Sequence, residues 1–238
     1  MTIDWVDDDG DFIRRRYDRI GKRHDLMEWL LFLPFGLRRM AVEWMDLQPG
    51  ARVLEIGCGT GPNLALLREA VGKDGQVFGV DFSAGMLAHA QTMCSRKGFD
   101  NVWLAQSDAL DFTAPEPLDA VLFSLSYNTM PHHRAVLAHA LAQLKPGGCI
   151  VVMDAKLPPG IAGKLILPFS IWLMKRTVLG NPHIRPWEHL SSTTVDFAMQ
   201  ECLFGSYYVC RGTKPSDDDR LNGQTRDQRY PPDRRAAS

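Results

Sequence analysis

The chain has 238 residues, of which 45% are hydrophobic and 23% charged, with a formal net charge of −1. This length supports one sizeable core, so we expect a single domain with decorations. The near-neutral charge provides no basic field over the whole molecule, which argues against nucleic-acid binding. Five scattered cysteines show neither C-x-x-C nor Cys/His spacing, so no zinc site and no disulfide framework is expected.

The chain begins with "MTIDWVDDDGD", which is acidic where a signal peptide would be basic and then apolar. We therefore predict a cytoplasmic protein. Apolar residues recur at three- and four-residue steps over 11–33, which predicts two short helices broken near Gly21. A further helix is expected over 36–46. The predicted organisation is an N-terminal helical cover over 1–35 and a main domain over 36–212.

The main domain alternates short apolar runs with helical patterns. Strands are predicted at 52–56, 76–80, 102–105, 119–123 and 149–153, and helices at 62–71, 83–97 and 132–144. Strand and helix alternation with nearly continuous apolar strands is typical of an α/β fold, in which a parallel sheet is covered on both faces.

The pattern changes after the fifth predicted strand. Residues 160–178 are apolar and are predicted to form a lid or a surface helix, too short in its apolar run to cross a membrane. The stretch 194–212 predicts two final strands that meet near Gly205. Residues 213–238 are polar, charged and almost free of aliphatic side chains, so we expect a disordered tail.

A glycine-rich turn follows the first predicted strand, with glycines at 57, 59 and 61. A strand that ends in glycines and leads into a helix brings backbone N–H groups close to a ligand, with no Cβ in the way. A dinucleotide site would require G-x-G-x-x-G to hold a pyrophosphate. Here the spacing is G-x-G-x-G, and Glu55 stands two residues before Gly57. The pattern favours a ligand with an ammonium-bearing amino-acid end and no pyrophosphate.

Two further acids follow the next strands. Asp81 ends the second predicted strand, 24 residues after Gly57, where a carboxylate can accept both hydroxyls of a ribose. Asp108 and Ala109 follow the third strand, where a carboxylate beside a small apolar residue suits the amine and flat face of an adenine. Because open α/β sheets bind ligands at the carboxyl ends of their strands, we expect these acids and Glu55 at one edge.

Four motifs in this order, "VLEIGCGTG", "VFGVDFSAGML", "SDAL" and "LKPGG", resemble the class I S-adenosylmethionine-dependent methyltransferases over residues 36–212. The resemblance implies a Rossmann-like, doubly wound sheet of seven strands, mostly parallel with the last strand antiparallel. It also implies S-adenosylmethionine as the cofactor. An oxidoreductase or a cofactor-binding regulatory subunit without activity is the alternative from another class.

The resemblance also assigns the cofactor-binding residues. The three glycines would line the methionine and ribose portion, Glu55 would lie near the methionine amine, and Asp81 would take the ribose hydroxyls. The remaining predicted contacts are Cys58 within the turn, Phe82 and Met86 flanking the adenine, Asp108 and Ala109 at its edge, and Ser124 at the end of the fourth strand.

Two stretches point to subgroups of this family. Residues 17–30, "YDRIGKRHDLMEWL", resemble the ubiquinone/menaquinone C-methyltransferases, with His24 and Glu28 in place of that pattern's tyrosine and asparagine. Residues 121–148 resemble bacterial lipid-amine N-methyltransferases. We therefore predict methyl transfer to a lipidic or amphipathic small-molecule acceptor, with nitrogen favoured. The alternative is O- or C-methylation of a quinone or a hydrophobic secondary metabolite.

Methyl transfer from a sulfonium depends chiefly on positioning and desolvation, so the candidate catalytic residues are those that could aim the acceptor. Tyr127 could face a methylammonium or orient an amine, or it is a buried core residue. His24 could act as a base, or it only caps or packs its helix. Tyr17 is the third candidate. No metal site is predicted. Basic residues flank the 160–178 segment, which is either an interfacial segment in reversible contact with a membrane or a packed lid.

Overall fold

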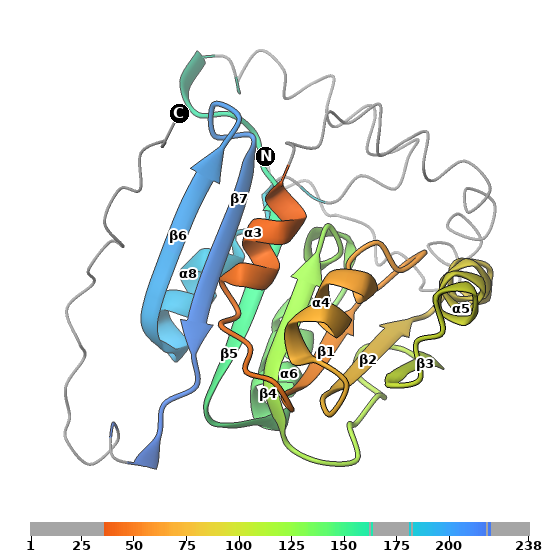
Figure 1. Ribbon diagram of the computed structural model, residues 1–238. Helices are drawn as coiled ribbons and strands as arrows, with labels where there is room; N and C mark the ends of the chain where they lie inside the picture. Colours follow the sequence, from red (N-terminus) through yellow and green to blue (C-terminus); the bar gives the residue numbers. More distant parts are fainter. Residues whose placement is uncertain (1–35, 162, 164–180, 182, 218, 220–238) are drawn as a thin grey trace, which may run out of the picture.

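The computed structural model describes residues 36–161, 163, 181, 183–217 and 219 (Figure 1). The predicted N-terminal cover, with Tyr17 and His24, lies outside the described residues. So do most of the 160–178 segment and most of the predicted tail. The extent of the cover, lid and tail therefore remains a prediction.

A seven-stranded sheet forms the centre of the described chain (Figure 1). Its spatial order is β3-β2-β1-β4-β5-β7-β6, and the pairs from β3 to β5 are all parallel, whereas β7 is antiparallel to both β5 and β6. This confirms the predicted sheet. The strands are β1 (Arg52–Ile56), β2 (Gln76–Asp81), β3 (Val102–Gln106), β4 (Leu118–Ser124), β5 (Leu144–Ala155), β6 (Val195–Cys202) and β7 (Tyr207–Thr213).

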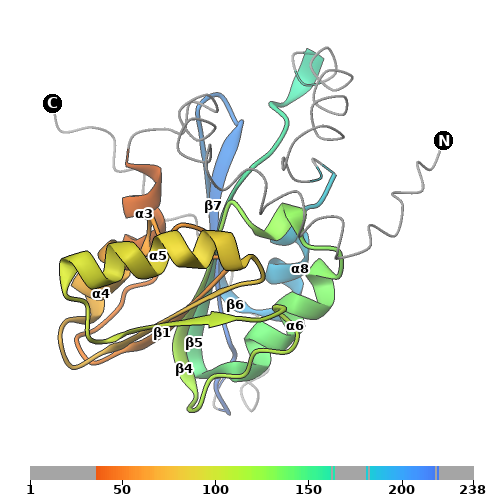
Figure 2. The ribbon, with the colours of Figure 1, turned by 90° about the vertical axis from the view of Figure 1, so that its right-hand side faces the viewer.

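Helices cover the two faces of the sheet (Figure 2). One face carries α3 (Leu37–Glu43), α4 (Leu64–Val71) and α5 (Ala84–Lys97), and the other carries α6 (His133–Gln143) and α8 (Pro186–Thr193). A 3-10 turn, η2 (Tyr127–Thr129), links β4 to α6. The sequence analysis missed α8, because its eight residues contain little apolar periodicity. Pro186 fits the first position of that helix, and Leu190 buries it against the sheet.

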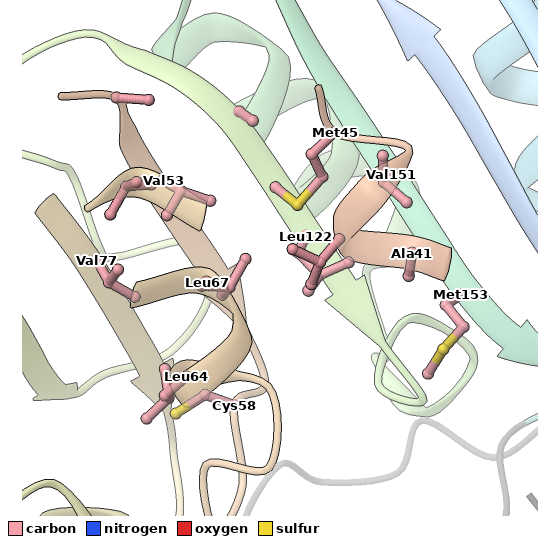
Figure 3. Packing of buried hydrophobic residues seen from close by; sticks show 14 of the residues in the cluster. Ala41, Met45, Val53, Cys58, Leu64, Leu67, Val77, Leu122, Val151 and Met153 are labelled. Carbon is pink, nitrogen blue, oxygen red and sulfur yellow. The ribbon is translucent and has the colours of Figure 1, made fainter. Parts of the chain in front are cut away.

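The inner strands are buried on both faces, so neighbouring residues of one strand belong to different cores. In β4, Leu122 joins the core under α3, α4 and α5, whereas Phe123 joins the core under α6 and α8. Figure 3 shows Leu122 and Val151 packing against Ala41 of α3. Burial on both faces explains why these strands are continuous apolar runs instead of alternating ones.

Two boundaries differ from the predicted ones. The fifth strand, predicted to start at residue 149, already starts at Leu144, because Leu144 pairs with Leu118 before the register shifts at Cys149. Thr213, placed in the tail from the sequence, is the last residue of β7. Lys214 continues the pairing, since its backbone N–H donates to the Gly148 carbonyl at 2.8 Å.

Candidate functional site

The glycine turn connects β1 to α4 at the carboxyl edge of the sheet, and its three glycines have left-handed φ angles of 74°, 56° and 87°. A Cβ on Gly57 would lie 2.5 Å from the Cβ of Ser126, and one on Gly61 would lie 2.8 Å from Leu64 Cδ1. These two glycines permit close packing within the protein. A Cβ on Gly59 would meet no atom within 4 Å, so the middle glycine faces open space where a ligand can approach the backbone.

Asp81 ends β2 beside this turn and is 7% exposed. Its Oδ2 accepts the backbone N–H of Gly59 at 2.8 Å, and its Oδ1 accepts that of Ser83 at 2.9 Å. These two bonds hold the carboxylate beside the open face of the turn. The predicted meeting of the glycine turn with the acid of the second strand is therefore present in the structure, and binding of a ribose by Asp81 remains a prediction.

Glu55 lies on β1, only 1% exposed, and is connected to a polar network. Its Oε1 accepts a hydrogen bond from Asn63 Nδ2 at 2.5 Å, and Asn63 Oδ1 accepts one from Arg38 Nη1 at 3.2 Å. Arg38 Nη1 also donates to Ser124 Oγ at 3.2 Å. The sequence analysis missed Arg38 and Asn63. Only Asn63 carried a signal, its place two residues after the last glycine of the turn.

Cys58 lies inside the glycine turn and is buried. Burial raises the pKa of its thiol well above the usual value, and the nearby Glu55 and Asp81 carboxylates raise that pKa further. The thiol therefore stays protonated at neutral pH. Asp81 bonds to the turn at Gly59 and Glu55 stands two residues before Gly57, so negative charge gathers where a ligand with an ammonium or sulfonium group would be favoured.

The residues that were predicted to surround an adenine differ in their burial. Phe82 is half-buried after β2, whereas Met86 in α5 is 1% exposed and belongs to the core. Asp108 is exposed, and its Oδ1 accepts the backbone N–H of Leu110 at 2.8 Å, which closes a local turn. Ala109 packs against the core under α6. Phe82 directly follows Asp81, which bonds to Gly59 of the turn, and the contact of these residues with adenine remains a prediction.

Tyr127 in η2 lies on the opposite face of the sheet from α4 and is 1% exposed. Its ring makes edge contacts with Phe123 at 5.3 Å and with His133 at 5.6 Å between centroids. Burial raises the pKa of the phenol above its usual value. Its hydroxyl has no hydrogen-bond partner among the described residues. The packed-core alternative therefore accounts for the ring, while the hydroxyl remains available to a ligand.

Asp154, which the sequence analysis missed, holds η2 in place from the end of β5. Its Oδ2 accepts the backbone N–H of Asn128 at 3.1 Å, and its Oδ1 accepts that of Ala155 at 2.8 Å. Burial raises the pKa of this carboxyl to about 7. No sequence signal distinguished Asp154, because it follows an apolar strand as many structural acids do.

The open space beside Gly59, the two buried acids and the uncharged thiol fit S-adenosylmethionine, whose amino-acid and ribose ends require a bare backbone and carboxylates. Together with the strand order and the antiparallel β7, this site defines a class I S-adenosylmethionine-dependent methyltransferase. The chain belongs to the methyltransferase domain family, whose model matches residues 47–189.

Relatives share this domain over different lengths. A demethylmenaquinone methyltransferase of Anoxybacillus flavithermus is 28% identical over 149 residues, which are 61% of this chain and 63% of that protein. The demethylmenaquinone methyltransferase of Desulfitobacterium hafniense is 28% identical over 207 residues, 84% of this chain and 81% of that protein.

The fold is also similar to a solved structure, phosphoethanolamine N-methyltransferase 2 of Haemonchus contortus, in complex with phosphomonomethylethanolamine and S-adenosylhomocysteine. That match has a TM-score of 0.70 and 16% identity, and it covers 86% of this chain and 60% of the other. At this identity, the likeness concerns the fold alone.

Proposed function

We propose that this protein transfers the methyl group of S-adenosylmethionine to a lipidic or amphipathic acceptor, with nitrogen as the favoured acceptor atom. Bound at the glycine turn, the cofactor supplies a methyl group on a positively charged sulfur, which needs no acid catalyst to leave. The task of the protein is then to hold the donor, aim the acceptor and exclude water.

Different described residues would bind different parts of the cofactor. The backbone of Gly59 is open to the ligand, and the Asp81 carboxylate would accept hydrogen bonds from the ribose hydroxyls. Glu55 supplies negative charge for the amino-acid ammonium. Its orientation is supported by Asn63, which Arg38 holds in turn. Because these groups are buried, charge contacts with a ligand would be stronger here than in water.

A lipidic acceptor is supported by an apolar cluster beside the carboxyl edge of the sheet. We call Ile161, Leu203 and Phe204 the apolar tip; their side chains are 76%, 45% and 92% exposed. The two segments that carry them meet closely, since a Cβ on Gly205 would lie 2.8 Å from Pro159 Cδ. Single exposed apolar residues are common, but three of them on two neighbouring segments at the carboxyl edge of the sheet suit contact with hydrocarbon.

This contact would be peripheral, because none of the described helices has the length and apolar character needed to cross a bilayer. The apolar tip would enter the interface between headgroups and acyl chains and deliver the acceptor to the sheet edge.

The second candidate is methylation of a quinone ring carbon. It is favoured by the relatives, which are named demethylmenaquinone methyltransferases. A neutral amine needs only positioning to attack the methyl group, whereas a ring carbon needs its neighbouring hydroxyl deprotonated. The two candidates therefore differ in whether the reaction rate depends on a base.

An activity assay with labelled S-adenosylmethionine over lipid extracts, amines, phenols and reduced quinones tests the proposal. We expect label in an organic-soluble product, and its structure identifies the methylated atom. Label only in water-soluble products would contradict a lipidic acceptor. Failure of S-adenosylhomocysteine to bind in calorimetry would contradict methyl transfer altogether.

Vesicle sedimentation tests the membrane contact. The Leu203→Asn/Phe204→Asn double variant should sediment less with vesicles than the wild type does, because asparagine suits the turn but not hydrocarbon. The matched control is Trp103→Ser, which removes a 44% exposed apolar side chain from β3. Equal sedimentation of all three proteins would remove the apolar tip as a membrane contact.

A further inference from the structure

A pocket of about 450 Å³ lies between η2, α6 and α8, on the face of the sheet opposite α4. We call it the α6–α8 pocket. Six side chains that carry the argument line it: Tyr127, His133, Arg134, Arg185, Glu188 and His189. These six side chains are polar and mostly basic, and none of them belongs to the cofactor site.

The charge in this pocket is unbalanced. Arg185 Nη1 pairs with Glu188 Oε1 at 3.0 Å, but Arg134 has no ion pair within the described part of the chain. The lining therefore contains two arginines and one carboxylate. Burial lowers the pKa of His133, and the neighbouring Arg134 and His189 lower that pKa further. The two guanidinium groups outnumber the one carboxylate, so a bound anion would balance the charge of this lining.

Hydrogen-bond donors also converge on the pocket. The first residues of α6 and of α8 both line it, and neither helix has a side-chain cap on its first N–H groups. The α8 helix begins with Pro186, which has no N–H, and carries Glu188 in its first turn, whereas the first turn of α6 carries no acidic residue. A helix start of this kind favours an anion through its free N–H groups and its dipole.

The hydroxyl of Tyr127 provides an independent indication. Tyr127 lines the pocket and is 1% exposed, and its hydroxyl lacks a partner among the residues described. Arg134 lines the same pocket. A buried donor without a partner costs free energy, which an anion's oxygen would recover.

We propose that the α6–α8 pocket binds a phosphate-class anion carried by the methyl acceptor. The guanidinium groups of Arg134 and Arg185 suit the oxygens of a phosphate, the start of α6 adds N–H donors, and Tyr127 adds a hydroxyl. A metal ion is not the occupant suggested by the histidines, because the described residues contain no group of three or more potential ligands. The assignment of the anion to the acceptor rests on the proposed function.

Thermal unfolding in inorganic phosphate, compared with chloride at equal ionic strength, tests the site. We expect phosphate to raise the Tm of the wild-type protein by about 2–4 °C, because a ligand of the native state stabilises it. Arg134→Gln should abolish this rise. The matched control is Arg96→Gln, an exposed arginine at the end of α5, which should keep it. No rise in the wild type, or an equal rise in Arg134→Gln, would overturn the proposal.

Vesicle sedimentation distinguishes a lipid from a soluble acceptor as the carrier of the anion. Arg134-dependent sedimentation with phosphatidylcholine vesicles containing phosphatidic acid, but not with phosphatidylcholine alone, would assign the anion to a lipid. A phosphate-induced Tm rise without that sedimentation would assign it to a soluble acceptor. Calorimetry with S-adenosylhomocysteine runs in parallel. Lost cofactor binding would overturn the proposed function, whereas intact cofactor binding without a phosphate response would overturn only the anion site.

Discussion

The Oδ2 atom of Asp81 accepts the backbone N–H of Gly59 at 2.8 Å, which joins the end of β2 to the glycine turn after β1. The second carboxylate oxygen accepts the N–H of Ser83, the residue that caps α5. One side chain therefore orders two loops and borders the open space at Gly59. We therefore expect cofactor binding to depend on this arrangement.

Asp81→Asn should weaken S-adenosylhomocysteine binding about ten- to hundredfold, or about 1.5–3 kcal/mol, because hydrogen bonds to a charged group are lost. Calorimetry measures the change. The control is Asp100→Asn, an exposed acid before β3, which should bind as the wild type does. Unchanged affinity in Asp81→Asn would remove this residue from the cofactor site.

Alanine substitutions should separate two roles of the turn glycines. Gly57→Ala should lose about 2–4 kcal/mol of stability, because the new Cβ meets Ser126 and φ is left-handed. Gly59→Ala should lose only about 1–2 kcal/mol, the cost of φ alone, but should weaken cofactor binding by filling the open space. Urea denaturation and calorimetry measure these changes. Equal stability losses would contradict the distinction.

Asp154 should make stability depend on pH. Its folded pKa is raised from 3.8 to about 7, so the native carboxyl keeps a proton that the unfolded one has already lost. This group's contribution to the free energy of unfolding therefore falls as pH rises from about 4 to about 7, by up to about 1.4 kcal/mol per pH unit. Asp154→Asn should flatten that slope in urea titrations. Parallel pH profiles for the two proteins would show that Asp154 is ionised throughout.

Phe204 adopts a left-handed φ of 55° and is 92% exposed, which is a strained conformation for a side chain with no burial to compensate. Phe204→Asn should raise the free energy of unfolding by about 0.5–1 kcal/mol, because asparagine tolerates this conformation. Phe204→Val should lower it, since a β-branched side chain tolerates it worst. Chemical denaturation ranks the three proteins. A less stable Phe204→Asn would mean that the phenyl ring packs in solution.

Much of the fold could be predicted because its signals are local. The apolar run at 52–56 and the glycines after it predict a strand and a turn without knowledge of any distant contact, and β1 has those bounds. α8 escaped prediction because its helix depends on Leu190 packing against the sheet, not on its own periodicity. Tyr127 was recognised as a candidate, but its burial between Phe123 and His133 depends on how α6 returns to the sheet.

The sequence by itself determined the alternation of strands and helices, the glycine turn with its acids, and hence the class of enzyme. These features are encoded in short stretches, where periodicity and turn chemistry act between near neighbours. Only the tertiary structure decided that Arg38 supports Asn63 and Ser124, which lie 25 and 86 residues away. The tertiary structure alone also brings Tyr127, Arg134 and Arg185 together around one pocket. Such groupings depend on how the helices pack against the sheet, which no local pattern specifies.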